Sequence, residues 1–304
     1  MKRMAMGILL CCLTLSTVAQ SSLDLFSLTG RHGFPAQYRN APELKGTEGG
    51  LMVNLKLPIR FNDKYIWYNE LTYSNFQVSA DSTFSSDVYH PLDLHGFILQ
   101  TGLVARISDK AAIQVLFAPR FMTDFAGSSN KNWQFGIIAL YENRYKETLM
   151  LRFGTILHQD MFGLNITPIV HTDWQLGDKW SIVGMWPVFG KVNYHISENT
   201  TTGLSHFGLT TTYRLGGTAY EGDYIERNSI DLALFLRQRI IGNIHLEGRA
   251  GYSLNRNYAQ FAEGDKLGLK ILIFNINDNR QVIQENIGNG FIASLRVVYN
   301  LPLD

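Results

Sequence analysis

Apolar and polar side chains alternate along at least ten segments of this chain. In residues 132–142, for example, Trp133, Phe135 and Ile137 alternate with polar positions such as Gln134. Successive side chains of a β-strand point to opposite faces, so each such segment has one apolar and one polar face. No comparable stripe at helical spacing is found, and no stretch after residue 20 approaches 18 consecutive apolar residues. The pattern predicts an all-β protein.

The connections between these segments alternate between short and long. Short turns rich in Asn, Asp or Gly are predicted at 61–64, 108–110, 142–146, 176–179 and 242–243. Longer polar loops are predicted at 79–91, 126–131, 159–163, 196–203 and 258–287. Short turns at one end and long loops at the other are typical of an antiparallel transmembrane β-barrel of the outer membrane.

Twelve strands are clear from the alternation, and two weaker candidates leave the total at twelve or fourteen. With both termini in the periplasm, the first connection is expected to be a long loop, but the short Asn62-Asp63 turn comes first. A weak strand at 22–29 resolves this conflict, and one at 218–225 resolves a second conflict at 215–228. The clear strands are 50–60, 64–78, 92–107, 111–124, 132–142, 147–158, 164–174, 179–195, 204–214, 229–240, 244–257 and 288–301.

One further segment, 267–277, has strand character inside the last long loop. We expect it to form either a hairpin within that loop or an extension of the barrel above the membrane. No repeat or low-complexity linker divides the chain, so residues 21–304 are predicted to form a single barrel domain.

The first twenty residues have the layout of a secretory signal. Lys2 and Arg3 precede a short apolar stretch at 5–15, and small residues follow at 16–19. We expect residues 1–20 to be a signal peptide that is cleaved near Ala19 or Gln20. Both cysteines lie within it, so the mature chain can form no disulfide.

Composition narrows the class of partner. The mean hydropathy is −0.05, and aromatic residues make up 12% of the chain. Removal of Lys2 and Arg3 with the signal leaves 25 basic and 26 acidic residues. A chain with no basic excess gives no indication of a nucleic-acid partner. Outer-membrane lipid, the outer-membrane assembly machinery, and a small solute or another envelope protein are the expected partners.

Charged residues occupy the polar faces of several predicted strands. In a barrel these faces point to the lumen, where charges of both signs can pair and fill the space or create a field across a pore. The sequence leaves both possibilities open. The candidates for the lumen are Arg106, Arg120, Glu142, Arg152, Asp231, Arg237, Glu247, Arg249 and Arg296.

Evidence for catalytic chemistry is sparse. His195 and Ser197 lie two residues apart and could share a strand face, which would suit a lipid-hydrolysing enzyme whose serine needs a nearby base. Because this pattern arises readily by chance, we expect no enzyme activity and no catalytic residue. The histidines are scattered without metal-ligand spacing, so neither a metal nor a cofactor is expected.

Several segments together resemble a known family. They are Tyr38-Arg39-Asn40-Ala41-Pro42, the strand, turn and Tyr-rich strand over 51–73, Gly251-Tyr252-Ser253-Leu254, and Asn277-Asp278-Asn279-Arg280 before a closing strand. In these features the chain resembles an uncharacterised family of Bacteroidota outer-membrane β-barrels, known as a domain of unknown function. The resemblance implies an architecture and a location in the cell outer membrane, and it supplies no activity.

The sequence therefore predicts an integral outer-membrane barrel that is a passive channel or a structural component of the envelope. A lipid-modifying enzyme of the outer membrane is one alternative. A soluble periplasmic β-sandwich or lipocalin-like binding protein is the other.

Overall fold

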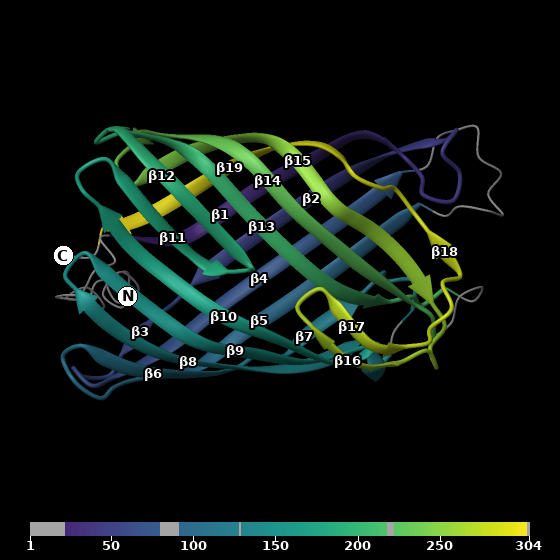
Figure 1. Cartoon of the computed structure of the whole chain (residues 1–304), viewed down its shortest axis with the longest axis horizontal. Coiled ribbons are helices and arrows are strands. Elements are labelled where there is room, and N and C mark those ends of the chain that lie inside the picture. The colour runs from purple at the N-terminus through teal and green to yellow at the C-terminus, as the bar shows by residue number, and fades with distance from the viewer. Residues whose placement is uncertain (1–21, 80–90, 128, 218–221, 303–304) are drawn as a thin grey trace, which may run out of the picture.

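The structure is a computed structural model, and it describes residues 22–79, 91–127, 129–217 and 222–302. The described residues form one sheet that curls into a closed barrel (Figure 1). The last strand closes the barrel on the first, with Ser22 opposite Pro302 and Gly33 opposite Ile292. All neighbouring wall strands are antiparallel, because each follows its predecessor through a hairpin connection. The predicted signal peptide, residues 1–20, lies outside the described residues.

Fourteen wall strands close this barrel. They are β1 (Ser22–Gln37), β2 (Lys45–Lys56), β4 (Tyr65–Ser79), β5 (Leu92–Arg106), β6 (Ala111–Phe117) continued by β7 (Arg120–Thr123), β8 (Trp133–Lys146), β9 (Leu149–Asp160), β10 (Gly163–Leu176), β11 (Trp180–Trp186), β12 (Phe189–Ser197), β13 (Thr200–Arg214), β14 (Tyr224–Ile241), β15 (Ile244–Phe261) and β19 (Gly290–Pro302). Small elements complete the described chain: β3 (Ile59–Arg60), a 3-10 turn at Asn130–Asn132, β16 (Leu267–Ile271), β17 (Phe274–Asp278) and β18 (Gln284–Glu285).

The structure confirms fourteen strands over twelve, but one of the two added strands is wrong. The predicted strand at 22–29 is the first half of β1. Of the predicted strand at 218–225, residues 224–225 begin β14, 222–223 are not in a strand, and 218–221 lie outside the described residues. The missing strand comes instead from 179–195, which splits into β11 and β12 at Pro187. Proline has no N–H for a strand ladder, and the Val188 N–H closes a tight turn onto the Met185 carbonyl at 2.8 Å.

Two predicted long loops are also wrong. The β9–β10 connection is only Met161-Phe162, and the β12–β13 connection is only Glu198-Asn199. The polar stretch 196–203 suggested a loop, but its threonines continue the ladder, with Thr201 opposite both His195 and Arg237. Threonine suits a strand because its branched side chain packs on the pleated surface. The predicted turn at 142–146 is largely strand, and the chain turns at Glu147-Thr148.

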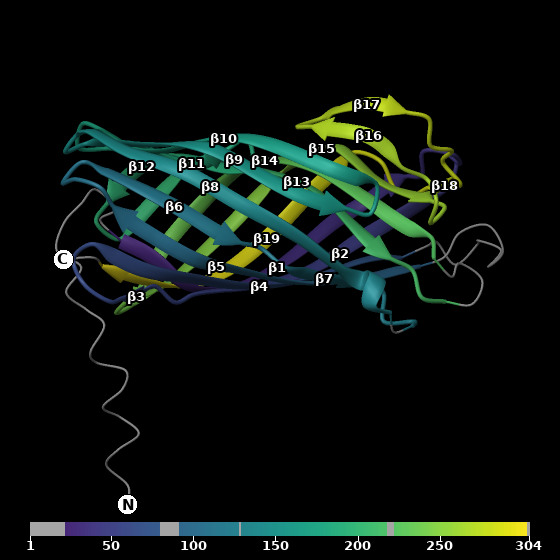
Figure 2. The ribbon, with the colours of Figure 1, turned by 90° about the horizontal axis from the view of Figure 1, so that it is seen from below.

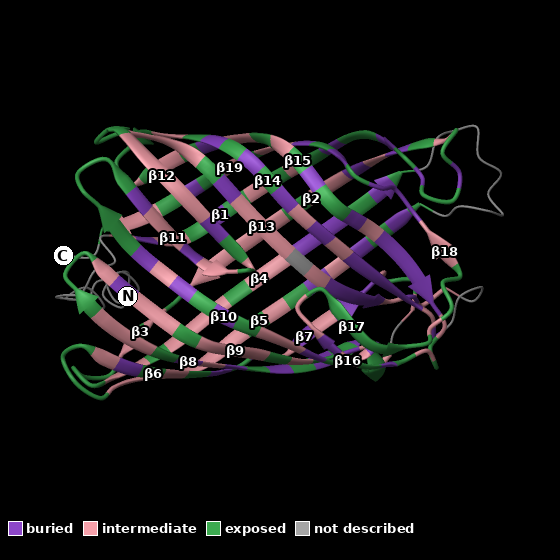
Figure 3. Cartoon of the chain, in the orientation of Figure 1, coloured by how far each residue is buried: buried purple, intermediate pink, exposed green. Residues whose placement is uncertain are grey.

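The outer surface of the barrel is an apolar belt. On β14, Leu232, Leu234 and Leu236 are 39, 70 and 53% exposed, whereas Ala233 and Phe235 between them are buried. The same alternation repeats around the wall (Figure 3). No described helix is long and apolar enough to span a bilayer. A closed barrel with apolar side chains outside and polar ones inside contradicts the β-sandwich alternative, whose core lies between two sheets.

The chain's two described ends lie at the same end of the barrel, which we call the terminal end; the opposite end is the loop end (Figure 1). Inside the loop end, opposite walls meet in one apolar cluster, which we call the loop-end core. Phe76 on β4, Leu94 on β5, Tyr213 on β13 and Ile225 on β14 are 4% exposed or less. A second inward-facing apolar cluster, the wall patch, lies on one side and includes Leu116, Ile138, Leu140 and Ile169.

Candidate functional site

The lumen of the barrel carries the candidate site, because the charged side chains of the wall gather there. Two pairs of the charged residues predicted for the lumen are direct cross-strand neighbours. Glu142 lies opposite Arg152 and Arg237 lies opposite Glu247. Cross-strand partners share a face, so such pairs can form ion pairs without crossing the lumen.

The largest group of predicted residues forms one ion-pair network near the terminal end. Asp24 accepts hydrogen bonds from Arg237 at 2.8 Å and Arg296 at 3.0 Å. Glu247 is paired with Lys191 at 2.6 Å and with Arg249. We call these six residues the basic cluster. It contains four cationic and two anionic side chains, so it carries a formal charge of about +2.

A second network, the Glu48 cluster, lies nearer the loop end. The Glu48 carboxylate pairs with Arg31 at 2.8 Å, Arg256 at 3.0 Å and Arg227 at 3.2 Å, and it accepts a hydrogen bond from Tyr258. Glu48, Arg227 and Arg256 are fully buried. Burial of one carboxylate among three guanidinium groups is favourable only because each charge finds a partner.

The Glu48 cluster is continuous with the loop-end core. The Arg227 guanidinium lies 3.7 Å from the centre of the Phe76 ring, and Tyr258 belongs to both groups. Asp231, which was predicted for the lumen, joins the cluster through Arg31 and also accepts a hydrogen bond from Ser253 at 2.7 Å. Together the two groups join side chains of β1, β2, β4, β14 and β15 inside the barrel.

The other predicted residues lie apart from both networks. Arg152 pairs with Glu142 at 2.6 Å on the β8–β9 side of the lumen. Arg120 is buried and pairs with Asp160. Arg106 ends β5 at the terminal end, where its backbone N–H donates to the Lys64 carbonyl.

Sequence reasoning missed Asp24, Arg31, Glu48, Lys191, Arg227 and Arg256. Arg256 shows why, since strict alternation from Glu247 and Arg249 would place it on the outer face. The β14–β15 register shifts near this point, and Asn255 adopts a left-handed conformation with φ of 48°. Such a bulge inserts an extra residue and reverses the faces beyond it. Glu48 was missed for another reason. It lies in the glycine-rich stretch 46–50, whose pattern did not predict a strand.

The residues proposed for an enzyme are not arranged for one. The β12–β13 register shifts between His195 and Ser197, so the two side chains are not neighbours on one face. His195 forms hydrogen bonds with Ser181 and Thr201, both at 3.2 Å, and Ser197 accepts one from the Asn199 backbone. Among the described residues, no three potential ligands of His, Cys, Asp or Glu type gather as a metal site.

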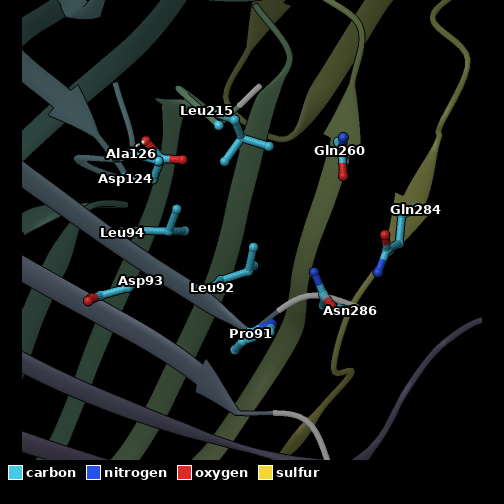
Figure 4. Close-up of a pocket in the computed structure, with 11 residues that line it drawn as sticks. Pro91, Leu92, Asp93, Leu94, Asp124, Ala126, Leu215, Gln260, Gln284 and Asn286 are labelled. Carbon is cyan, nitrogen blue, oxygen red and sulfur yellow. Dashed lines mark hydrogen bonds between the residues drawn. The ribbon is translucent and has the colours of Figure 1, made fainter. Parts of the chain in front are cut away.

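A recess opens at the loop end beside the loop-end core (Figure 4). Its volume is about 290 Å³, and Leu92, Leu94 and Leu215 of the loop-end core form part of its lining. Asp124, Gln260 and Asn286 supply polar groups to it. The recess therefore ends on a packed apolar floor.

Comparisons with known proteins find barrels of this general kind. No family model and no curated protein matches the chain. Among solved structures, the COG4313 outer membrane channel from Pseudomonas putida F1 is similar with a TM-score of 0.45 and 10% identity over 91% of this chain and 94% of that one. The NanC porin gives a TM-score of 0.36 and 11% identity over 90% and 98%, and the TodX monoaromatic hydrocarbon channel gives 0.37 and 8% over 91% and 89%. Similarity this distant transfers no activity.

Proposed function

We propose that the chain is an integral outer-membrane protein whose lumen is a passive channel that prefers anions. The apolar belt supports insertion in a bilayer, since lipid-facing side chains of a membrane barrel are apolar. The terminal end would face the periplasm, because it carries the short turns and both described chain ends. Membership of the Bacteroidota family stays a prediction from the resemblance.

The excess of basic over acidic side chains in the lumen is the observation that carries this proposal. The basic cluster has a formal charge of about +2, and the Glu48 cluster with Asp231 adds three arginines and two carboxylates. A charge of one sign on low-dielectric walls attracts the opposite ion and repels the like one. The packed loop end would keep the conductance low.

Ion selectivity in planar bilayers tests the proposal. Under a potassium chloride gradient, the reversal potential of the purified protein is expected to have the sign for chloride preference. Arg249→Gln removes one lumen cation and is expected to reduce that preference. Lys45→Gln is the matched control, because Lys45 is exposed at the start of β2.

Two results would contradict the proposed anion-preferring channel. Cation preference in the parent protein would show that the lumen charges do not select the ion. Complete absence of conductance would instead favour the second reading of the sequence, a structural component of the envelope, for which the packed loop end is the supporting feature.

A further inference from the structure

The barrel wall is interrupted between β10 and β13, because the hairpin between them is short. β11 and β12 contain seven and nine residues, whereas β10 and β13 contain 14 and 15. β10 pairs with β11 only from Val170 onward, and the ladder between β12 and β13 ends at Phe207. Among the described residues, the stretches 167–169 and 209–213 have no strand partner on the sides that face each other. We call this interruption the wall break.

The turn Pro187-Val188 borders the wall break on one side. The Val188 carbonyl still accepts a hydrogen bond from the Gly208 N–H at 2.7 Å. The two edges meet again toward the loop end, where the Met161 N–H donates to the Thr212 hydroxyl at 3.1 Å. The wall break is thus bounded on all sides and lies part-way along the barrel (Figure 1).

A hairpin from the last loop lies outside the wall at this place (Figure 2). We call residues 267–280, which include β16 and β17, the strap. The strap adds to the free edge of β10, with Ile271 opposite Ile166, and the Leu272 N–H donates to the Ile166 carbonyl at 3.1 Å. This confirms the hairpin predicted for 267–277 over the alternative of a simple extension of the barrel.

Buried ion pairs hold the strap against the outside of β14. Glu226 accepts from Lys270 at 2.6 Å and from Arg280 at 2.7 Å, and all three side chains are almost completely buried. Arg280 also donates to Asp278, and these hydrogen bonds lower the pKa of the Asp278 carboxyl. The strap also packs through Leu267 against Phe162 and Phe261, which are buried, so Glu226 is the ionic part of a larger contact.

The tip of the strap is apolar and exposed. Ile273 and Phe274 are each 64% exposed. They lie next to the part of β10 whose outward side chains, Leu164 and Val170, belong to the apolar belt. Exposed apolar side chains at this level are in contact with lipid if the barrel is in a membrane.

On the inner side, the wall break lies next to two kinds of lumen-facing side chain. Ile169 and Met185 belong to the wall patch, which is apolar. Lys191 lies on the neighbouring strand β12, opposite Val183, and belongs to the basic cluster. An apolar surface beside a cationic one fits a molecule with an apolar tail and an anionic head. Toward the loop end, the loop-end core and the Glu48 cluster place buried side chains inside the barrel.

We propose that a single-chain anionic amphipath, such as a long-chain fatty acid, enters the lumen sideways from the outer leaflet through the wall break, with the strap as the gate. Its chain would pass along the wall patch, and its carboxylate would pair with Lys191 and its neighbours on the way to the terminal end. This inference rests on the proposed membrane barrel and names a substrate class for it.

Uptake of radiolabelled oleate by whole cells tests the proposal. The protein is expressed in a Gram-negative host that lacks its own long-chain fatty-acid channel, and heat-modifiable gel mobility checks that each variant is folded. The variant Ile166→Cys/Ile271→Cys places a disulfide between β10 and the strap, where the two residues are register partners. The described residues contain no other cysteine. The control Ile182→Cys/Val192→Cys places a disulfide between β11 and β12, away from the strap.

We expect oleate uptake above that of the empty host, a loss of at least about fivefold in the oxidised strap variant, and recovery with dithiothreitol. The oxidised control is expected to match the parent. Uptake equal to the empty host, or uptake unaffected by the strap disulfide, would overturn the proposal. Methyl oleate, which lacks the anionic head, is expected to enter more slowly, and equal uptake would contradict the role of the cationic surface.

Chloride conductance separates this inference from the proposed channel. The oxidised strap variant is expected to conduct chloride like the parent, because the strap lies outside the lumen. Strap-dependent oleate uptake without chloride conductance would contradict the ion channel and support the lateral route. Chloride conductance without oleate uptake would support the ion channel and contradict the lateral route.

Discussion

Single residues decide how this lumen is filled, and Glu48 is the clearest case. One carboxylate compensates Arg31, Arg227 and Arg256, and two of these arginines are fully buried with it. Replacement of such a carboxylate leaves buried cations without a partner, which is far more destabilising than the pair itself is stabilising.

Glu48→Gln is therefore expected to lower the free energy of unfolding by about 3 kcal/mol or more. Urea titration of the protein in lipid vesicles measures the change. Glu43→Gln, at an exposed position in the β1–β2 connection, is the control and is expected to change stability by less than about 0.5 kcal/mol. A Glu48 variant as stable as this control would show that the three arginines are solvated in the lumen.

Single residues also show which parts of the lumen could be predicted from the sequence. Glu142 lies opposite Arg152 and Arg237 lies opposite Glu247, because residues that share a face follow from a period of two along each strand. Alternation failed at Arg256, where a bulge at Asn255 reverses the faces, and at Glu48, whose glycine-rich surroundings gave no strand pattern. Bulges and glycine-rich strands leave no signal in a local pattern.

At the level of elements, the short β11–β12 hairpin and the strap belong together. The short hairpin leaves edges of β10 and β13 without strand partners, and the strap covers part of the β10 edge. Uncovered strand edges readily pair with other chains, so a covering hairpin protects the barrel from association. The sequence predicted a hairpin near 267–277 but not its position against β10. Parallel pairing with a distant strand leaves no signal in the local sequence pattern.

Glu226→Gln is expected to release the strap, because Glu226 is the shared acceptor for Lys270 and Arg280. Amide hydrogen exchange over 267–278 is expected to accelerate by about tenfold or more, while β14 and β15 beyond it keep their protection. The comparison variant is Glu198→Gln, at an exposed turn of the terminal end. Unchanged exchange in the strap would show that its backbone pairing with β10 and the apolar contacts of Leu267 suffice to hold it.

At the scale of the whole molecule, the apolar belt determines that the barrel surface needs an apolar medium around it. Four tryptophans of the belt, Trp67, Trp133, Trp174 and Trp180, are between 38 and 50% exposed on different strands. A barrel that exposes aromatic side chains around its circumference needs an apolar medium and is expected to require detergent or lipid for solubility.

Reconstitution in vesicles of phosphatidylcholine with brominated acyl chains measures this directly. Bromine quenches tryptophan fluorescence on contact, so we expect the emission to fall substantially relative to unbrominated vesicles. A soluble protein that is not quenched would contradict membrane insertion.

The sequence by itself determined the all-β class, the two faces of the wall, most of the strands and their even number, because alternation and turn residues act between neighbours along the chain. Only the tertiary structure decided how many strands close the barrel, that Glu48 meets Arg227 and Arg256, that the lumen is packed at the loop end, and that the strap lies beside β10. These features join positions far apart in sequence, and they depend on how the tilt and stagger of the closed sheet bring distant strands together.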